Sequence, residues 1–191
     1  RTVRDLSSLN IRVAHEVKGC AKNVLPYLMD GETFLDTLLI SPPGAGKTTL
    51  LRDLIRELSC GGTWGAGKNV SVVDERSEIA ACFGGVAQCD LGPRTDVMDG
   101  CPKSEGMLMM LRSMAPQVLA VDEITAPEDV AALCAAAGCG VTVLATAHGE
   151  NREDLLRRAV YAPLWERSLF RRLVTIRRGQ TGREYVVEEL N

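Results

Sequence analysis

Residues 41–49 combine residue types that could do phosphate chemistry: Ser-Pro-Pro-Gly-Ala-Gly-Lys-Thr-Thr. An apolar run precedes them, and a segment with leucines on one helical face follows. In this order of strand, glycine loop and helix, backbone N–H groups converge on one point, where their partial positive charge binds phosphate. Lys47 would reach the β- and γ-phosphates of a nucleotide, and the Thr48 hydroxyl would ligate Mg²⁺. We therefore predict a site for a nucleoside triphosphate with Mg²⁺, formed by Pro43, Gly44, Ala45, Gly46, Lys47, Thr48 and Thr49.

Two details of the sequence bear on this assignment. Ser41 stands where the G-x-x-x-x-G-K-[ST] motif has its first glycine. Residues 62–68 also match G-x-x-x-x-G-K, but Asn69 follows in place of serine or threonine. This second stretch comes after a predicted helix and before a predicted strand, the reverse of the order that a phosphate loop needs. We interpret it as a flexible connection.

Carboxylates follow two apolar, strand-like runs. Residues 118–123 read VLAVDE, and Asp122 at such a strand end suits a water-mediated contact to Mg²⁺. Glu123 is placed to polarise the attacking water as a catalytic residue. The second run ends in the acidic stretch DERSE at residues 74–78. Because close carboxylates repel unless they share a cation, we count Glu78 among the candidate metal ligands.

Four further side chains are candidates near the phosphates. Thr146 and His148 close the apolar run VTVLAT at residues 141–146, and this polar pair could sense the γ-phosphate. Arg94 and Arg112 could each contact a phosphate, either within the subunit or across a subunit boundary, as arginine fingers do. The alternative for both arginines is ion pairing with the many nearby carboxylates.

The elements that position these residues alternate along the chain. Because strands that alternate with helices form a parallel sheet covered by helices, the pattern predicts an α/β fold with its ligand at the carboxyl ends of the strands. One helix has clear start signals, a capping box of Thr125 with Glu128 and Pro127 in the first turn. A Gly-, Asp- and Pro-rich loop occupies residues 83–103. The predicted strands are 33–40, 69–74, 117–122 and 141–146, the helices are 48–59, 103–114, 125–138 and 151–160, and a C-terminal β-hairpin pairs 169–177 with 183–189.

Composition narrows the class of protein. The 191 residues carry a net charge of −3, which gives no global case for nucleic-acid binding, although the C-terminal end is rich in arginine. No apolar run approaches the length of about 20 residues that a membrane-spanning helix needs. Seven cysteines without a C-x-x-C pair predict free thiols in a reducing cytoplasm.

The first 32 residues are interpreted separately. Residues 6–13 are strand-like, but the stretch is too short to bury a core of its own. The chain begins with Arg1 rather than methionine, so we expect residues 1–32 to be the tail of an N-terminal region that is truncated here. Residues 33–191 would form the ATPase domain.

Together these motifs resemble the stage III sporulation protein AA family, which is similar to the ATPases of type II and type IV secretion and pilus systems. The most specific segments are VVDERSEIAACFGG, LGPRTDVMDGCPKSEGM and LRSMAPQVLAVDEI. The resemblance implies a RecA-like P-loop NTPase in which residues 44–49 are the Walker A loop and Glu123 ends Walker B. It also implies that Glu75 and Glu78 belong to an acidic box, with Glu75 catalytic, and that His148 marks a histidine box.

The resemblance further implies how such a protein works. It would be a homo-oligomer, a hexameric ring, in the cytoplasm of the mother cell, peripheral to the membrane that faces the forespore. There it would energise a channel made by membrane-embedded partners, without contacting nucleic acid directly. Two alternatives stay open at this point: a nucleic-acid-acting ATPase, for which the basic C-terminal end is the support, and a nucleotide-gated scaffold with little turnover.

Overall fold

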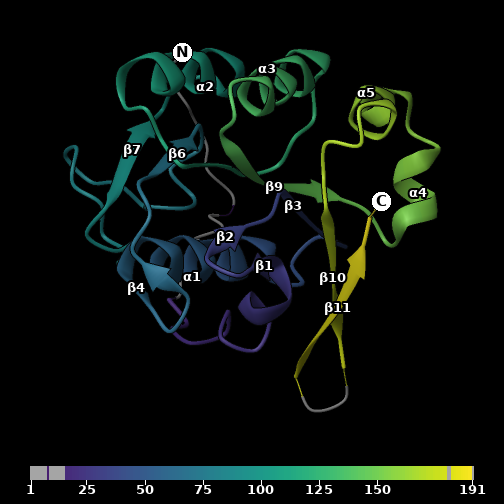
Figure 1. Cartoon of the computed structure of the whole chain (residues 1–191), viewed down its shortest axis with the longest axis horizontal. Coiled ribbons are helices and arrows are strands. Elements are labelled where there is room, and N and C mark those ends of the chain that lie inside the picture. The colour runs from purple at the N-terminus through teal and green to yellow at the C-terminus, as the bar shows by residue number, and fades with distance from the viewer. Residues whose placement is uncertain (1–7, 9–15, 180–181, 191) are drawn as a thin grey trace.

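A seven-stranded sheet runs through the centre of the computed structural model, which describes residue 8, residues 16–179 and residues 182–190 (Figure 1). All neighbouring strands are parallel except the edge pair β10–β11, which is antiparallel. In spatial order the strands are β11 (Arg183–Glu189), β10 (Arg172–Arg178), β3 (Thr37–Ser41), β9 (Thr142–His148), β8 (Val118–Val121), β6 (Val70–Asp74) and β7 (Thr95–Asp99).

The central strands form because both of their faces can be buried. Every residue of β3, β6 and β8 is buried, and their sequences are almost continuous apolar runs. Such runs are typical of parallel strands, since helices cover both faces of a parallel sheet. The predicted α/β architecture with a mostly parallel sheet and a C-terminal hairpin is confirmed.

Helices cover the sheet in two layers (Figure 1). Helix α1 (Lys47–Cys60) packs on one face with the 3₁₀ turn η1 (Leu25–Leu28), where Leu50, Leu54 and Leu28 are fully buried. The other face holds the remaining helices, which share a second apolar cluster. These are α2 (Lys103–Ser113), α3 (Pro127–Gly138), α4 (Arg152–Leu156), the 3₁₀ turn η2 (Ala159–Tyr161) and α5 (Ala162–Glu166).

Several predicted elements have different bounds in the structure. The strand predicted at 33–40 is split into β2 (Thr33–Phe34), which pairs with β1 (Met29–Asp30), and β3. The break falls at Asp36, whose carbonyl accepts hydrogen bonds from two backbone N–H groups at the start of β10. Strand β7 lies inside the stretch predicted as a loop. It is a half-exposed edge strand with aspartates at positions 96 and 99, a residue type that disfavours strands, so its sequence gives little strand signal.

Three other local predictions are corrected. Residues 61–66 are not a flexible connection, because β4 (Gly61–Gly62) and β5 (Gly65–Ala66) pair in a short hairpin. The start of α3 is capped by Asp129, whose Oδ2 accepts hydrogen bonds from Thr125 N–H and Ala126 N–H at 3.1 Å each, rather than by Glu128. The single helix predicted at 151–160 ends at Leu156, and the separate helix α5 follows it.

The segment before β2 packs on α1. Ala21, Val24 and Leu25 are buried in the same cluster as the α1 leucines. The backbone N–H of Ala21 donates to Asp53 Oδ2 at 2.7 Å, and Arg56 donates to Asp53 Oδ1. Residues 6–7 and 9–13 of the strand-like N-terminal stretch lie outside the described residues. Within the described part of the chain, none of the helices combines the length and apolarity that crossing a membrane requires.

Replacing Asp53 with asparagine should lower the free energy of unfolding at pH 7 by about 2 kcal/mol, because buried donors lose an anionic acceptor. Burial acts to raise the pKa of Asp53, but hydrogen bonds from Ala21 and Arg56 outweigh it, so the pKa is lowered. A carboxyl with a lowered pKa stabilises the fold fully above the unfolded-state pKa of about 3.9, and this contribution is lost as the pH falls through the folded-state pKa.

Urea unfolding across this acid range tests the prediction. The Asp53→Asn variant should lose part of the wild-type decline in stability on acidification. Asp96→Asn, a change at an exposed position of β7, serves as the control and should behave as wild type. An Asp53 variant with unchanged stability would show that this carboxylate does not anchor the N-terminal segment.

Candidate active site

The glycine loop leaves the carboxyl end of β3 and turns directly into α1. Gly44 and Gly46 have φ angles of 72° and 108°, in a region that residues with a Cβ rarely adopt. The helix begins at Lys47, so its first N–H groups lie at the loop. The strand, loop and helix therefore have the order that the motif requires for phosphate binding.

Lys47 is held between the ends of β3 and β9. Its Nζ lies 3.2 Å from the Ser41 carbonyl oxygen, 3.3 Å from Ser41 Oγ and 3.0 Å from His148 Nδ1. Burial lowers the pKa of Lys47, and the nearby Asp122 and Glu123 carboxylates partly oppose that effect. Ser41 is thus an oxygen ligand of the lysine in this structure, which gives a role to the residue that departs from the motif.

Asp122 joins the first turn of α1 to β9. Its Oδ2 accepts a hydrogen bond from Thr48 Oγ1 at 2.9 Å, and its Oδ1 accepts one from Thr146 Oγ1 at 2.5 Å. A hydroxyl and a carboxylate placed together beside a phosphate loop fit Mg²⁺, which usually takes one or two protein oxygens and completes its shell with phosphate and water. This donor set is compatible with the metal ligands predicted at Thr48 and Asp122.

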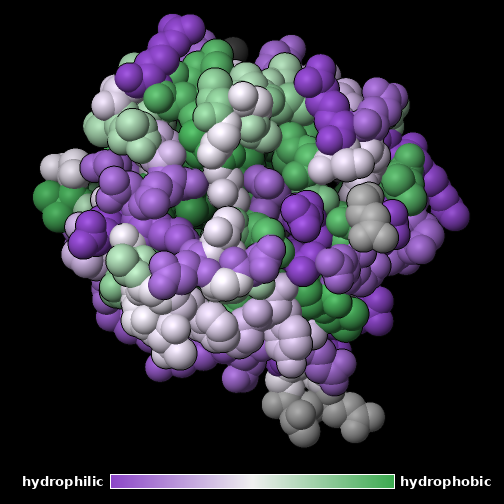
Figure 2. Space-filling view, in the orientation of Figure 1, coloured by the Kyte–Doolittle hydropathy of each residue, from purple (hydrophilic) through white to green (hydrophobic). Residues whose placement is uncertain are grey.

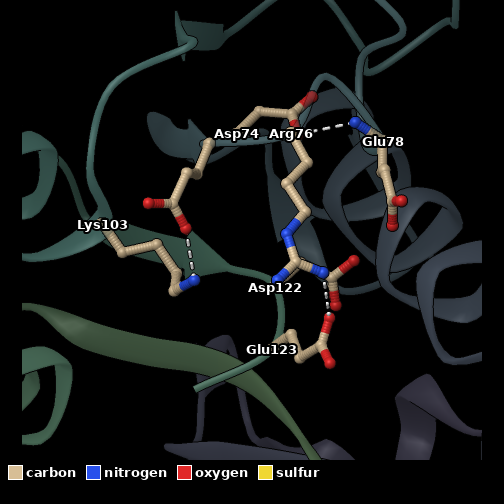
Figure 3. Close-up of a pocket in the computed structure, with 7 residues that line it drawn as sticks. Asp74, Arg76, Glu78, Lys103, Asp122 and Glu123 are labelled. Carbon is tan, nitrogen blue, oxygen red and sulfur yellow. Dashed lines mark hydrogen bonds and ion pairs between the residues drawn. The ribbon is translucent and has the colours of Figure 1, made fainter. Parts of the chain in front are cut away.

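Glu123 occupies a strained backbone position, and its carboxylate contacts His148 and Arg76. Its φ angle is 51°, in the left-handed region, and its N–H donates to Thr146 Oγ1 at 2.8 Å. Strain of this kind persists only where the surroundings hold it, and it is common at functional sites. One carboxylate oxygen lies 2.6 Å from His148 Nε2, and the other lies 3.1 Å from an Arg76 guanidinium nitrogen (Figure 3).

His148 links the lysine to the glutamate. Because a protonated Lys47 can only donate, Nδ1 of the imidazole accepts, and Nε2 carries the proton that is donated to Glu123. The two contacts thereby define the tautomer. The imidazole is placed to couple whatever Lys47 binds to the orientation of the Glu123 carboxylate.

The turn after β6 forms the other wall of the site (Figure 3). The buried Asp74 carboxylate accepts hydrogen bonds from the N–H groups of Glu78, Ile79 and Ala80. Burial raises the pKa of Asp74, and these three hydrogen bonds counteract it. Beside this turn, Lys103 Nζ at the start of α2 lies 2.6 Å from Glu75 Oε2. A pocket lies here, lined by Asp74, Glu75, Arg76, Glu78, Lys103, Asp122 and Glu123.

The structure brings most of the predicted site residues to one edge of the sheet. Lys47, Thr48, Asp122, Glu123 and His148 form one network of contacts. The acidic stretch at 74–78 borders that network, since its two predicted glutamates line the same pocket as Asp122 and Glu123.

Two predicted arginines lie elsewhere within this chain. Arg94 precedes β7, and its carbonyl accepts from the N–H of Val70, so it lies at the amino ends of the strands, opposite the phosphate loop. Arg112 is exposed near the end of α2, about 14 Å along the helix from Lys103 by its rise of about 1.5 Å per residue. The structure thus does not bring either arginine to the loop of its own subunit, and a role across a subunit boundary stays a prediction.

Sequence reasoning missed two contributors to the site: Arg76, which pairs with Glu123, and Lys103, which pairs with Glu75. Neither had a usable signal, since an arginine or lysine near carboxylates in sequence is usually on a solvated surface. Thr146, which was predicted with His148 as a polar pair near the phosphates, donates to Asp122 and accepts the N–H of Glu123.

The fold and site define a class of protein. The structure superposes on the Legionella pneumophila ATPase DotB with a TM-score of 0.65 and 18% identity, covering 91% of this chain and 50% of DotB. It superposes on the pilus retraction motor PilT with bound ADP with a TM-score of 0.63 and 17% identity, covering 94% of this chain and 55% of PilT. The chain therefore has the RecA-like fold of secretion and pilus ATPases, as predicted.

The sequence comparison identifies the family. The family model described as sporulation stage III, protein AA, matches residues 1–187, and the chain belongs to this family. The stage III sporulation protein AA of Bacillus subtilis (strain 168) is 47% identical over 178 residues. That match covers 93% of this chain and 58% of the relative, so the chain spans little more than half of the relative's length. The predicted family is confirmed.

Replacing Thr146 with valine should lower the free energy of unfolding by about 1–3 kcal/mol, because Asp122 and the Glu123 N–H each lose a buried partner while the shape is kept. Thr175→Val is a matched control in the same sheet. Its hydroxyl is also buried but has no hydrogen-bond partner among the described residues, so the change should be neutral or stabilising. Chemical unfolding of both variants measures the difference, and equal effects would contradict the role assigned to Thr146.

Proposed function

We propose that this protein is a Mg²⁺-dependent ATP hydrolase. The observation that carries the proposal is the continuous network from Lys47 through His148 to Glu123, with Asp122 held beside Thr48. This network would put a phosphate ligand, a metal-ligand pair and a general base at one glycine loop. The fold also supports the proposal that the protein hydrolyses ATP. It is shared with a protein named as an ATPase and with a motor whose structure contains ADP.

Each residue would have a distinct task. The loop N–H groups and Lys47 would bind the β- and γ-phosphates, and Thr48 and Asp122 would hold Mg²⁺, which would neutralise charge that develops on the phosphates. Glu123 would orient and deprotonate the attacking water. Because Arg76 and His148 both contact Glu123 in this structure, they would set the direction of its carboxylate. Glu75 and Glu78 would support the metal site from the wall that they line.

We infer further that hydrolysis drives a motor in a membrane-associated export or channel complex of sporulation. The family supplies the sporulation context, and the fold is shared with a pilus motor and a secretion-type ATPase. The protein would act as a homohexamer in the mother-cell cytoplasm, bound peripherally through membrane-embedded channel proteins at the membrane facing the forespore. Arg94 and Arg112 are candidates to complete a neighbour's site in such a ring.

Steady-state hydrolysis of ATP with Mg²⁺ tests the enzyme assignment. Lys47→Ala should lose both ATP binding and turnover. Glu123→Gln should keep ATP binding but lose about 10²- to 10⁴-fold in turnover, because it removes only the general base. Glu128→Gln, an exposed change of the same type near the same strand, should hydrolyse ATP like wild type.

Equal rates in wild type and both site variants would exclude the hydrolase and leave a nucleotide-gated scaffold. Hydrolysis that rises strongly on addition of RNA or single-stranded DNA would favour a nucleic-acid-acting ATPase over an export motor.

The ring assignment predicts an oligomeric mass. The full-length protein carrying Glu123→Gln should reach the mass of a hexamer when ATP and Mg²⁺ are present, because the variant binds without turnover. Light scattering coupled to size-exclusion chromatography measures this mass. A monomeric mass with and without ATP would contradict a ring.

A further inference from the structure

The C-terminal hairpin brings two arginines to the glycine loop. One guanidinium nitrogen of Arg178, the last residue of β10, donates to the Gly44 carbonyl oxygen at 3.2 Å. Arg183, the first residue of β11, lies over Gly46. A Cβ built on that glycine would come within 2.5 Å of the guanidinium carbon of Arg183. Residues 178 and 183 are therefore in contact with the loop, although they are more than 130 positions from it in sequence.

The register of the hairpin explains this placement. Arg178 pairs with Arg183 across the two strands, and directly opposite residues project from the same face. Two residues further in, the pair Ile176 and Tyr185 packs in the apolar cluster that contains α1. Because side chains alternate between faces with a period of two, the arginine pair projects toward the amino end of α1.

The charge arrangement at this end of the hairpin is unbalanced. At the other end of the same ladder, Arg172 pairs with Glu189 in an ion pair of 3.1 Å. Arg178 and Arg183 are instead two like charges directly opposite one another, a combination that destabilises a strand pair. No ion pair joins either of them to a carboxylate within residues 16–179 and 182–190. Two exposed guanidinium groups beside a phosphate loop suit a shared anion, since arginine binds phosphate oxygens bidentately. Figure 2 shows hydrophilic residues at the lower end of the molecule, where Figure 1 places the turn end of the β10–β11 hairpin.

We propose that Arg178 and Arg183 are nucleotide phosphate ligands that the hairpin contributes within the same subunit. The proposal rests on the proposed function, because it concerns the same loop. In the sheet, β3 has β9 on one side and β10 on the other. The phosphates would therefore be held between the hydrolytic residues Glu123 and His148 on the β9 side and the two arginines on the β10 side. When nucleotide binds, Arg178 would exchange the Gly44 carbonyl for phosphate oxygen.

Calorimetric titration of the full chain with Mg²⁺·ATPγS tests this assignment. Arg178→Ala and Arg183→Ala should each weaken binding by about tenfold to a hundredfold, as the loss of a hydrogen bond to a charged group does. Arg183→Lys should recover part of the affinity, because it keeps the charge but not the bidentate geometry. Arg177→Ala is the matched control. It removes an exposed arginine from the same strand, but one that projects from the opposite face, and it should bind like wild type.

The melting temperature, measured with and without nucleotide, separates an effect on binding from an effect on folding. Without nucleotide, Arg183→Ala should melt at or above the wild-type temperature, because a like-charge pair is removed, while the stabilisation by Mg²⁺·ATPγS should shrink. A variant that melts earlier without nucleotide and binds normally would assign the arginine to the fold and overturn the proposal.

The same titrations distinguish failure of the arginine assignment from failure of the proposed function. If wild type binds, Lys47→Ala does not, and the double variant of Arg178 and Arg183 binds like wild type, the arginine assignment is wrong and the proposed function stands. If wild type itself does not bind Mg²⁺·ATPγS, both are wrong.

Discussion

The two hydrogen bonds that Asp122 accepts, from Thr48 and from Thr146, are the interaction on which the rest of the site depends. They join the start of α1 to the carboxyl ends of β8 and β9, three segments that are distant in sequence. The same Thr146 oxygen accepts the N–H of Glu123 and so helps to hold that residue at its positive φ angle. One buried hydroxyl thus positions both Asp122 and Glu123, the residues proposed as a metal ligand and as the general base.

Without nucleotide, the charged groups of the site largely satisfy one another. Lys47, His148, Glu123 and Arg76 form a chain in which cationic or donor groups meet acceptors. This arrangement limits the desolvation cost of burying Lys47, whose pKa is lowered by burial. A bound triphosphate would replace several of these partners at once, so occupancy of the loop would be communicated to Glu123. The hairpin arginines Arg178 and Arg183, by contrast, form no ion pair with a carboxylate of the described residues.

Most of the fold was predictable because its signals are local. Continuous apolar runs indicated the buried strands, and the glycine loop between such a run and an amphipathic helix indicated the phosphate site. Errors arose where non-local contacts decided the outcome. The strand predicted at 33–40 is divided because residues 33–34 pair with β1, whereas residues 37–41 pair with β10 and β9. Strand β7 is a strand because it pairs with β6 along the sheet edge.

The sequence by itself was enough to predict which residues would carry the chemistry at the strand ends: Lys47 and Thr48, Asp122 and Glu123, and His148. Their grouping follows from chain order, because parallel strands end at one edge. Only the tertiary structure decided that Arg76 meets Glu123 and that Arg178 and Arg183 reach the loop. Alternation fixes the face from which a strand residue projects, but not the strand that lies beside it. That neighbour depends on the spatial order of the sheet, which places β10 against β3 through long-range pairing that no local pattern records.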